Sequence, residues 1–235
     1  MPAADAAPGP RMVIIIDDLG NNRRLGEAAI DLPGNLTFSI LPGLAYSTAL
    51  AERAHAEGRE VMLHMPMANH SRFPLGPMGL EAHMTANEWQ ETLDEALADV
   101  PHAAGLNNHM GSLLTEREEP MGLVMETLSE HNLYFIDSLT SARSIAYQTA
   151  RQHDVPALKR HVFLDHEQTD AFISGQFEQA LAIMEQQGWV IMIGHPYPET
   201  IDFLDWILPL LDEVGVELVT PSELIRTQQP LTLAD

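Results

Sequence analysis

Three histidines each lie at the end of an apolar run that is typical of a β-strand. They are His64 in VMLHMPM, His109 in GLNNHMG and His195 in VIMIGHP. A fourth run, VIIIDDLG, ends in the carboxylates Asp17 and Asp18. If these strands share one parallel sheet, their carboxyl ends lie at one edge, where two acids and three imidazoles meet. Together these residue types could hold one metal ion and supply a general base and a general acid.

The acidic pair and His64 also have plain structural interpretations. Adjacent carboxylates oppose joint ionisation unless a cation lies near them, but an Asp pair at a strand end can also cap a helix. Consecutive strand residues face opposite sides, so both acids serve one site only if the strand ends there, as Gly20 favours. His64 could be a hydrogen-bonded core residue. The polar groups around His109 and the Gly-His-Pro setting of His195 are harder to explain by packing alone.

Composition and charge exclude several classes of protein. A chain of 235 residues, 45% of them hydrophobic, can bury one large core. Its net charge of -22 repels phosphates, so we expect no nucleic-acid partner. The absence of cysteine excludes disulfides and thiolate ligands. No run approaches the roughly 20 apolar residues of a membrane span, and residues 1–11 do not resemble a signal peptide.

Strand-like and helix-like segments alternate along the chain. Continuous apolar runs, typical of strands that are covered on both faces, occur at 12–17, 36–41, 60–65, 104–109, 133–137, 161–165, 189–194 and 216–219. Between them, amphipathic segments follow Ser47, Pro120 and Ser174, and Thr85 with Glu88 forms a capping box. The alternation predicts an α/β fold with a parallel sheet, open or closed into a barrel. We expect a disordered head over 1–10, one domain over 11–225 and a polar tail over 226–235.

The connection over residues 66–84 is unusually long. Loops of this length inside a compact domain are often functional. Its apolar side chains argue against disorder: Phe73, Leu75, Met78 and Leu80. Its place after His64 would let it wall a substrate groove, or it could pack as a lid that does not touch substrate.

Taken in order, the motifs resemble those of the divergent polysaccharide deacetylases, which are related to the NodB-type carbohydrate esterases. The resemblance covers about residues 11–225 and rests on VIIIDDLG, LTFSILP, EVMLHMPM, PLGPMGL, GLNNHMGS, YFIDS, VFLD and VIMIGHP. It implies a distorted (β/α) barrel of about seven parallel strands and a divalent metal, usually zinc. It also implies that many members are exported, so we expect a periplasmic or secreted protein whose export segment is absent from this chain; a cytoplasmic location stays open.

The resemblance also implies roles for four residues. In the better-studied esterases the first Asp of the pair is the base, the second binds the metal with two histidines, and a late histidine is the acid. By position, Asp17 becomes the base, Asp18 and His64 become metal ligands, and His195 becomes the acid.

One position departs from the pattern of those esterases. They place both metal histidines four residues apart on one segment, but the residue four after His64 is Ala68. His109, from the next strand, is the best substitute for the missing ligand.

Further polar residues near strand ends are candidates for supporting roles. Asp137 and Asp165 could orient His195 or Asp17, although both could equally cap helices. Arg160 could pair with either carboxylate. Asn108 is a candidate donor to the carbonyl oxygen of a substrate.

The residues predict a metal-dependent hydrolase, and the resemblance implies that it removes N- or O-acetyl groups from a carbohydrate or another acetylated small substrate. A phosphatase of the haloacid-dehalogenase type needs acids at positions i and i+2, and Leu19 counts against it. A non-catalytic envelope protein that binds a glycan or a metal on the same fold remains the alternative.

Overall fold

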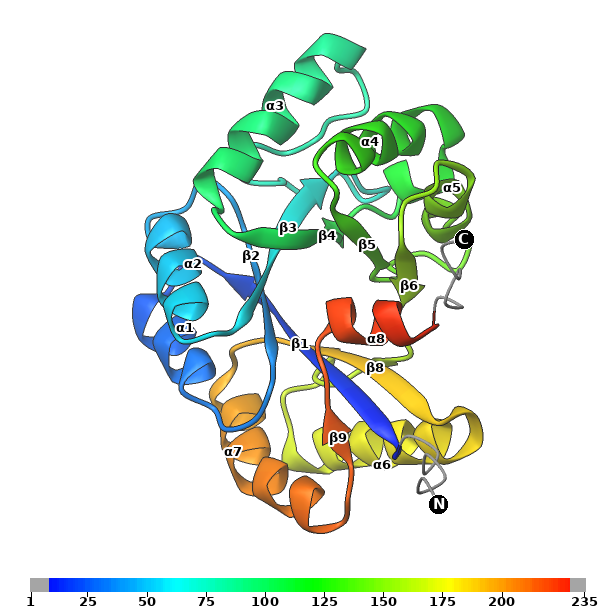
Figure 1. Ribbon diagram of the computed structural model, residues 1–235. Coiled ribbons are helices and arrows are strands. Elements are labelled where there is room, and N and C mark those ends of the chain that lie inside the picture. Colours follow the sequence, from blue (N-terminus) through cyan, green and yellow to red (C-terminus); the bar gives the residue numbers. More distant parts are fainter. Residues whose placement is uncertain (1–8, 229–235) are drawn as a thin grey trace, which may run out of the picture.

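Nine parallel strands form one sheet in the computed structural model, which describes residues 9–228 (Figure 1). Eight of them follow the order β6-β5-β4-β3-β2-β1-β8-β7, and β9 pairs with β1. Their bounds are β1 Arg11–Leu19, β2 Thr37–Ile40, β3 Glu60–Met67, β4 Ala103–Met110, β5 Tyr134–Asp137, β6 Ala157–Lys159, β7 Val162–Phe163, β8 Trp189–Gly194 and β9 Glu217–Leu218. The predicted distorted (β/α) barrel is confirmed, with more strands than the seven expected.

The chain between β6 and β7 links the first and the last strand of this order, which are the two edges of the sheet. The Arg160 backbone N–H donates to Asp137 O on β5, and the next N–H, from His161, donates to Ile191 O on β8. A short stretch of chain therefore spans the barrel where the sheet order ends. β6 was not expected from the sequence because its three residues, Ala-Leu-Lys, form no apolar run. The expected strand over 161–165 is reduced to β7, because the chain before Val162 is still crossing from one edge of the sheet to the other.

Helices surround the sheet, and α8 lies inside this outer ring (Figure 1). Their bounds are α1 Arg23–Ile30, α2 Ser47–Ala56, α3 Ala86–Asp99, α4 Glu118–Glu130, α5 Ala146–Gln152, α6 Asp170–Gln187, α7 Pro198–Glu213 and α8 Pro221–Gln228, with the 3-10 turn η1 at Leu114–Glu116. The capping box of Thr85 and Glu88 at the start of α3 is confirmed. The expected start of α6 after Ser174 is wrong, because Thr169 accepts the Phe172 N–H and begins the helix earlier.

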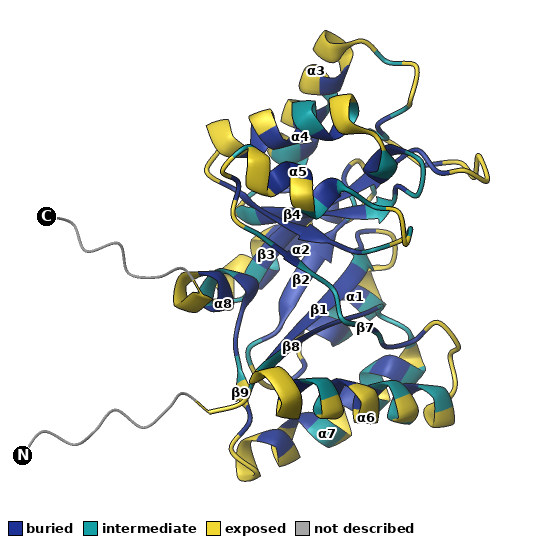
Figure 2. Cartoon of the chain, turned by 90° about the vertical axis from the view of Figure 1, so that its right-hand side faces the viewer, coloured by how far each residue is buried: buried dark blue, intermediate teal, exposed yellow. Residues whose placement is uncertain are grey.

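Two apolar layers lie on the two faces of the sheet. The inner layer fills the barrel and includes Val13 and Ile15 of β1 and Ile191 and Ile193 of β8, with Leu224 of α8 packed against them. The outer layer lies between the strands and the surrounding helices (Figure 2). Because side chains alternate along a strand, the next inward positions toward the carboxyl ends carry polar residues. The barrel is thus apolar at one end and polar at the other.

The long connection over 66–84 folds back on the end of β3. The Leu80 N–H donates to Pro66 O, and Leu80 O accepts the Ala68 N–H. Leu75 and Leu80 are buried, whereas Phe73 is 65% exposed. The loop is therefore an ordered part of the polar end of the barrel, as its apolar residues led us to expect.

The expected head and tail fall mostly outside the described residues. Positions 1–8 and 229–235 are not described, and α8 extends through Gln228. Among the described residues, no helix combines the length and apolar character that a membrane crossing requires.

Replacing Gly105 by Ala is expected to destabilise the barrel. Gly105 lies opposite Tyr134 on the neighbouring strand, and a Cβ at this position would overlap the Tyr134 ring. The ring has little room to move, because it is buried and its hydroxyl donates to Glu60 Oε1 at 2.7 Å. Overpacking of this kind costs about 1–3 kcal/mol in the free energy of unfolding, measurable by urea denaturation.

Gly175→Ala is the matched control for that substitution. Gly175 is exposed in the middle of α6, and a Cβ there meets nothing within 4 Å. It should leave stability unchanged or raise it by up to about 1 kcal/mol. Equal destabilisation by both substitutions would contradict the proposed clash.

Candidate metal centre and its neighbours

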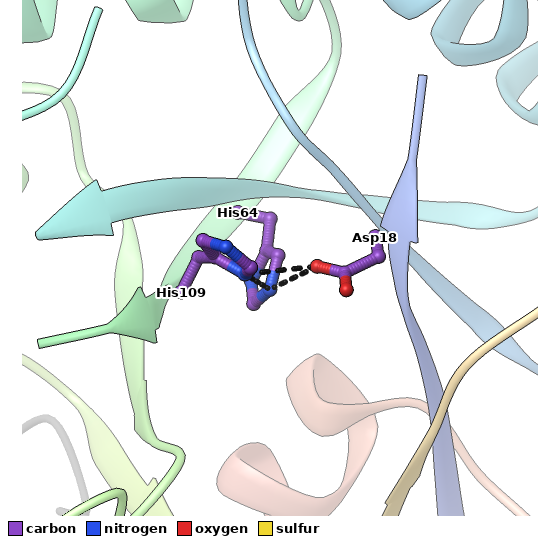
Figure 3. Close-up of side chains that lie close together, drawn as sticks. All are labelled: Asp18, His64 and His109. Atoms are coloured by element: carbon purple, nitrogen blue, oxygen red, sulfur yellow. Dashed lines mark hydrogen bonds and ion pairs between the residues drawn. The ribbon is translucent and has the colours of Figure 1, made fainter. Parts of the chain in front are cut away.

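Asp18, His64 and His109 converge on one point at the polar end of the barrel (Figure 3). Asp18 Oδ1 lies 2.9 Å from His109 Nδ1 and 3.1 Å from His64 Nε2, and the two nitrogens are 3.2 Å apart. The three expected ligands come from β1, β3 and β4, so the sheet brings together residues that are far apart in sequence.

The dimensions and chemistry of this triangle fit a divalent metal ion. Zinc bonds of about 2.0–2.1 Å to nitrogen and oxygen imply ligand atoms about 3.3 Å apart in a tetrahedron, close to the observed spacings. Asp18 Oδ1 is buried and has no hydrogen-bond partner of acceptable geometry in the described chain, although two ring nitrogens lie beside it. A buried carboxylate oxygen that faces two imidazole nitrogens in this way is typical of a site that can hold a cation.

The backbone of β1 explains how two consecutive acids reach the same side of the sheet. Asp17 follows Val13 and Ile15 on the inward face by strand alternation. Asp18 has a φ of 61°, in the left-handed region that Asp tolerates better than most residues. This irregularity within the strand directs the second carboxylate toward the histidines. The expected strand end at this point is wrong, because β1 continues to Leu19, which pairs with Ile40; the register shift between Ile16 and Leu19 interrupts the alternation instead.

Asn107 of β4 connects the metal triangle to Asp17. Its Nδ2 donates to both Asp17 oxygens, at 2.9 and 3.1 Å, and its Oδ1 lies 2.7 Å from His64 Nδ1. Ser39 Oγ donates to the same Oδ1 at 2.6 Å. Because that oxygen can only accept, His64 carries a proton on Nδ1, so Nε2 is the atom that would face a metal ion once its own proton is lost. One amide side chain therefore orients a metal ligand and a buried carboxylate.

Burial and neighbouring charges shift the pKa values of these groups in opposite directions. Burial raises the pKa of Asp17, and the nearby His64 and His195 only partly oppose it. Burial would also raise the pKa of Asp18, but the contacts with His109 and His64 hold it well below its usual range. For His64, burial lowers the pKa, yet Asp17 and Asp18 outweigh that effect and raise it to about 9. The two carboxylates thus favour positively charged partners, which can be protonated imidazoles or a metal ion.

His195 lies across from the triangle and is fixed by Asp165. The ring Nδ1 is 2.8 Å from Asp165 Oδ1, while Asp165 Oδ2 accepts the His195 backbone N–H and the Thr200 hydroxyl. The other ring nitrogen, Nε2, lies 3.8 Å from Asp18 Oδ2. Burial lowers the pKa of His195, but the bond to Asp165 and the charges of Asp165 and Asp18 raise it overall. The expectation that Asp165 could orient His195 matches this geometry.

Asn108 and Asp137 make structural contacts instead of facing the triangle. Asn108 Nδ2 donates to Met110 O and Thr140 Oγ1, and its Oδ1 accepts the Ser138 N–H. This amide is therefore occupied, which argues against its expected role as a donor to substrate. Asp137 accepts the Leu139 N–H and the Ser144 hydroxyl, so it stabilises the turn after β5 and does not orient His195 or Asp17.

Arg160 also differs from its expected pairing. Its guanidinium donates to Ser138 O at 2.7 Å and to Leu139 O at 3.1 Å. Within the described chain it forms no ion pair with Asp137 or Asp165. Burial lowers its pKa, and the charges of Asp17 and Asp137 partly offset this. Arg160 therefore holds the backbone after β5 in place.

Asn107 and Ser39 are the residues that the sequence analysis missed. A signal for Asn107 was present in the strand pattern. In β4, side chains two residues apart share a face, so Asn107 must lie on the same side as His109 while Asn108 points away. Ser39 had no comparable signal, because a lone serine in a short apolar strand is common.

The fold and the site together define a NodB-like (β/α) barrel of the kind found in carbohydrate esterases. The family model for divergent polysaccharide deacetylases matches residues 14–225. The chain therefore belongs to the divergent polysaccharide deacetylase family.

Two of the sequence relatives of this chain are bacterial proteins. The uncharacterized protein YibQ of Escherichia coli (strain K12) is 35% identical over 219 residues, covering 93% of this chain and 68% of that protein. An uncharacterized protein of Haemophilus influenzae is 34% identical over 219 residues, covering 93% and 78%.

Solved structures share the fold. The uncharacterized protein ATU2773 of Agrobacterium tumefaciens C58 is similar with a TM-score of 0.89 and 24% identity, covering 94% of this chain and 91% of that one. Peptidoglycan deacetylase PdaC of Bacillus subtilis has a TM-score of 0.56 and 16% identity, covering 94% and 93%. A CE4 family pseudoenzyme of Bacillus anthracis has a TM-score of 0.56 and 14% identity, covering 92% and 66%.

Asn107→Ala is expected to lower zinc affinity about 10–100-fold, the usual effect of removing a residue that orients a metal ligand. It would leave His64 Nδ1 and Asp17 without their shared partner. Isothermal titration calorimetry measures the affinity, and circular dichroism checks the fold.

Asn108→Ala is the neighbouring control, since that side chain bonds the backbone after β4 and β5. It should lower stability but change zinc affinity less than Asn107→Ala. A larger loss of zinc affinity in Asn108→Ala than in Asn107→Ala would show that Asn107 does not orient the ligand.

Proposed function

We propose that this protein is a metal-dependent hydrolase that removes N- or O-acetyl groups from a carbohydrate. The observation that carries the proposal is the arrangement of three potential ligands between a buried carboxylate and a histidine–carboxylate pair. Asp18, His64 and His109 form the triangle, Asp17 lies on one side, and His195 with Asp165 lies on another.

Zinc fits the proposed ligands best, because two imidazoles and one carboxylate are a common set for catalytic zinc. A bound divalent cation would supply a Lewis acid for the acyl carbonyl and make the attacking water more acidic. With no thiolate in the chain, the available donors are nitrogen and oxygen alone. The buried negative charge of Asp17 and Asp18 adds electrostatic attraction for the ion.

Asp17 is suited to act as the general base. Its carboxylate lies 3.6 Å from His64 Nε2 and outside the triangle, so it can take a proton from water without serving as a ligand. Asn107 holds both of its oxygens in one orientation. The same bonds stabilise the ionised form against the opposing effect of burial.

His195 is suited to act as the general acid. Asp165 binds the proton on Nδ1, which leaves Nε2 directed toward the triangle. Because its pKa is raised, His195 retains its second proton at higher pH than an ordinary histidine. It can therefore donate from Nε2 to the leaving amine or alcohol, while Asp165 stabilises the charged ring.

A glycan outside the cytoplasm is the substrate class that we propose. The solved structure of a peptidoglycan deacetylase on the same fold supports this choice by analogy. A periplasmic or secreted location follows from the same analogy.

A non-catalytic role in binding a glycan or a metal is the second candidate. The observation that favours it is Ala68, which stands where the better-studied esterases carry a metal histidine. Its backbone anchors the loops instead: Ala68 O accepts the N–H groups of Leu113 and Leu114. A pseudoenzyme also occurs on the same fold. Release of acetate from N-acetylated oligosaccharides by the zinc-loaded protein distinguishes the two candidates.

His64→Ala and His109→Ala are each expected to abolish stoichiometric zinc binding, because two protein ligands remain where three are needed. Zinc content after dialysis, measured by inductively coupled plasma mass spectrometry, checks this. His131→Ala is the control, because His131 is exposed at the end of α4 and should not affect zinc. Full occupancy in either of the first two variants would remove that residue from the ligand set.

Asp17→Asn and Asp18→Asn should separate catalysis from metal binding. The first should keep zinc and lose about 10²–10⁴-fold in kcat, the usual value of a positioned general base. The second should lower zinc affinity. Acetate release and zinc titration measure the two effects. Turnover of Asp17→Asn at the parent rate, or loss of its zinc, would refute the assignment of Asp17 as the base.

A further inference from the structure

Helix α7 presents a stripe of exposed apolar side chains on its outer face. Trp206 is 62% exposed, Leu210 38% and Val214 72%. Trp206 and Leu210 lie four residues apart on one side of α7, and Val214 follows at the C-cap of the helix; we call these three residues the α7 stripe. Exposed tryptophan within an apolar stripe is a feature of protein interfaces, where this residue contributes much of the binding energy.

The α7 stripe is supported from the core by a row of aromatic rings. The buried Phe177 of α6 lies 5.4 Å from Phe203, and Phe203 lies 6.1 Å from Trp206, measured between ring centroids. Phe203 is itself packed against the main hydrophobic cluster. Trp206 is therefore backed by a rigid part of the fold, which lowers the entropy cost of using it as an anchor.

Acidic side chains flank the α7 stripe. They are exposed and lie on the same helix: Asp202, Asp205, Asp212 and Glu213. The helix contains no lysine or arginine, and none of these four carboxylates forms an ion pair within the part of the chain that the structure describes. By helical spacing the four acids lie on one side of the stripe, so the surface combines an apolar stripe with an acidic rim along that side.

We propose that the α7 stripe binds a basic amphipathic helix of a partner protein. Apolar residues of such a helix would cover Trp206 and Leu210, and its lysines or arginines would meet the acidic rim. A second copy of this chain is disfavoured, because a two-fold contact would bring the same acids together. Anionic membranes are disfavoured by the same charges.

This surface is separate from the proposed metal site. Trp206 lies eight residues along α7 from Pro198, a rise of about 12 Å away from the end of the helix that follows His195. The inference therefore does not depend on the proposed function.

The test uses a labelled synthetic helix of about 18 residues with leucines on one face and lysines on the other. Fluorescence anisotropy at low ionic strength measures its binding to the full chain. Trp206→Ala is expected to weaken binding about 30-fold, the effect of losing a central interface tryptophan. Asp202→Asn combined with Asp205→Asn should weaken it at least about threefold.

The matched control removes the same charge from another exposed helix. Glu91→Gln combined with Glu95→Gln on α3 should leave the affinity unchanged, because these residues are exposed and far along the chain from α7. If the double substitutions on α3 and on α7 weaken binding equally, the peptide binds through general charge attraction, and the proposal is overturned. Equal binding of a leucine–glutamate helix, Trp206-dependent binding to phosphatidylglycerol vesicles, or a dimer that dissociates in Trp206→Ala would also overturn it.

Discussion

Two adjacent carboxylates at the end of β1 impose the main constraint on this structure. Asp17 is 2% exposed, and a buried carboxylate is stable only with hydrogen bonds or a cation close by. Asn107 supplies the hydrogen bonds to Asp17, while His64 and His109 lie against Asp18. The polar end of the barrel is arranged around these two charges.

Curvature of the sheet makes this arrangement possible. β1 and β4 are separated by β2 and β3, so in a flat sheet they would lie about 14 Å apart. Nevertheless Asn107 Nδ2 on β4 is 2.9 Å from Asp17 on β1. A strongly curled sheet brings these inward side chains into contact, with Ser39 of β2 and His64 of β3 joining the same network. The barrel is therefore a requirement of the site as well as its support.

On the proposed assignment, the third ligand comes from β4 and not from the segment that follows His64. Where the better-studied esterases have a histidine, Ala68 contributes its backbone to the loops around the site. His109 on the adjacent strand presents its Nδ1 to the same point. Parallel neighbours in register make this exchange simple, since Pro66 pairs with His109 and His64 with Asn107 across β3 and β4.

The sequence by itself determined the elements that depend on local pattern. Apolar runs predicted most strands, Thr85 with Glu88 predicted the start of α3, and the residues at strand ends identified Asp17, Asp18, His64, His109 and His195 as neighbours. It could not show that Asn107 would bond both Asp17 and His64, nor that Arg160 would bond backbone carbonyls. Strand β6 was also beyond it, and β7 is shorter than the strand that it predicted. These features depend on the curvature of the whole sheet, which brings together residues that no local pattern relates.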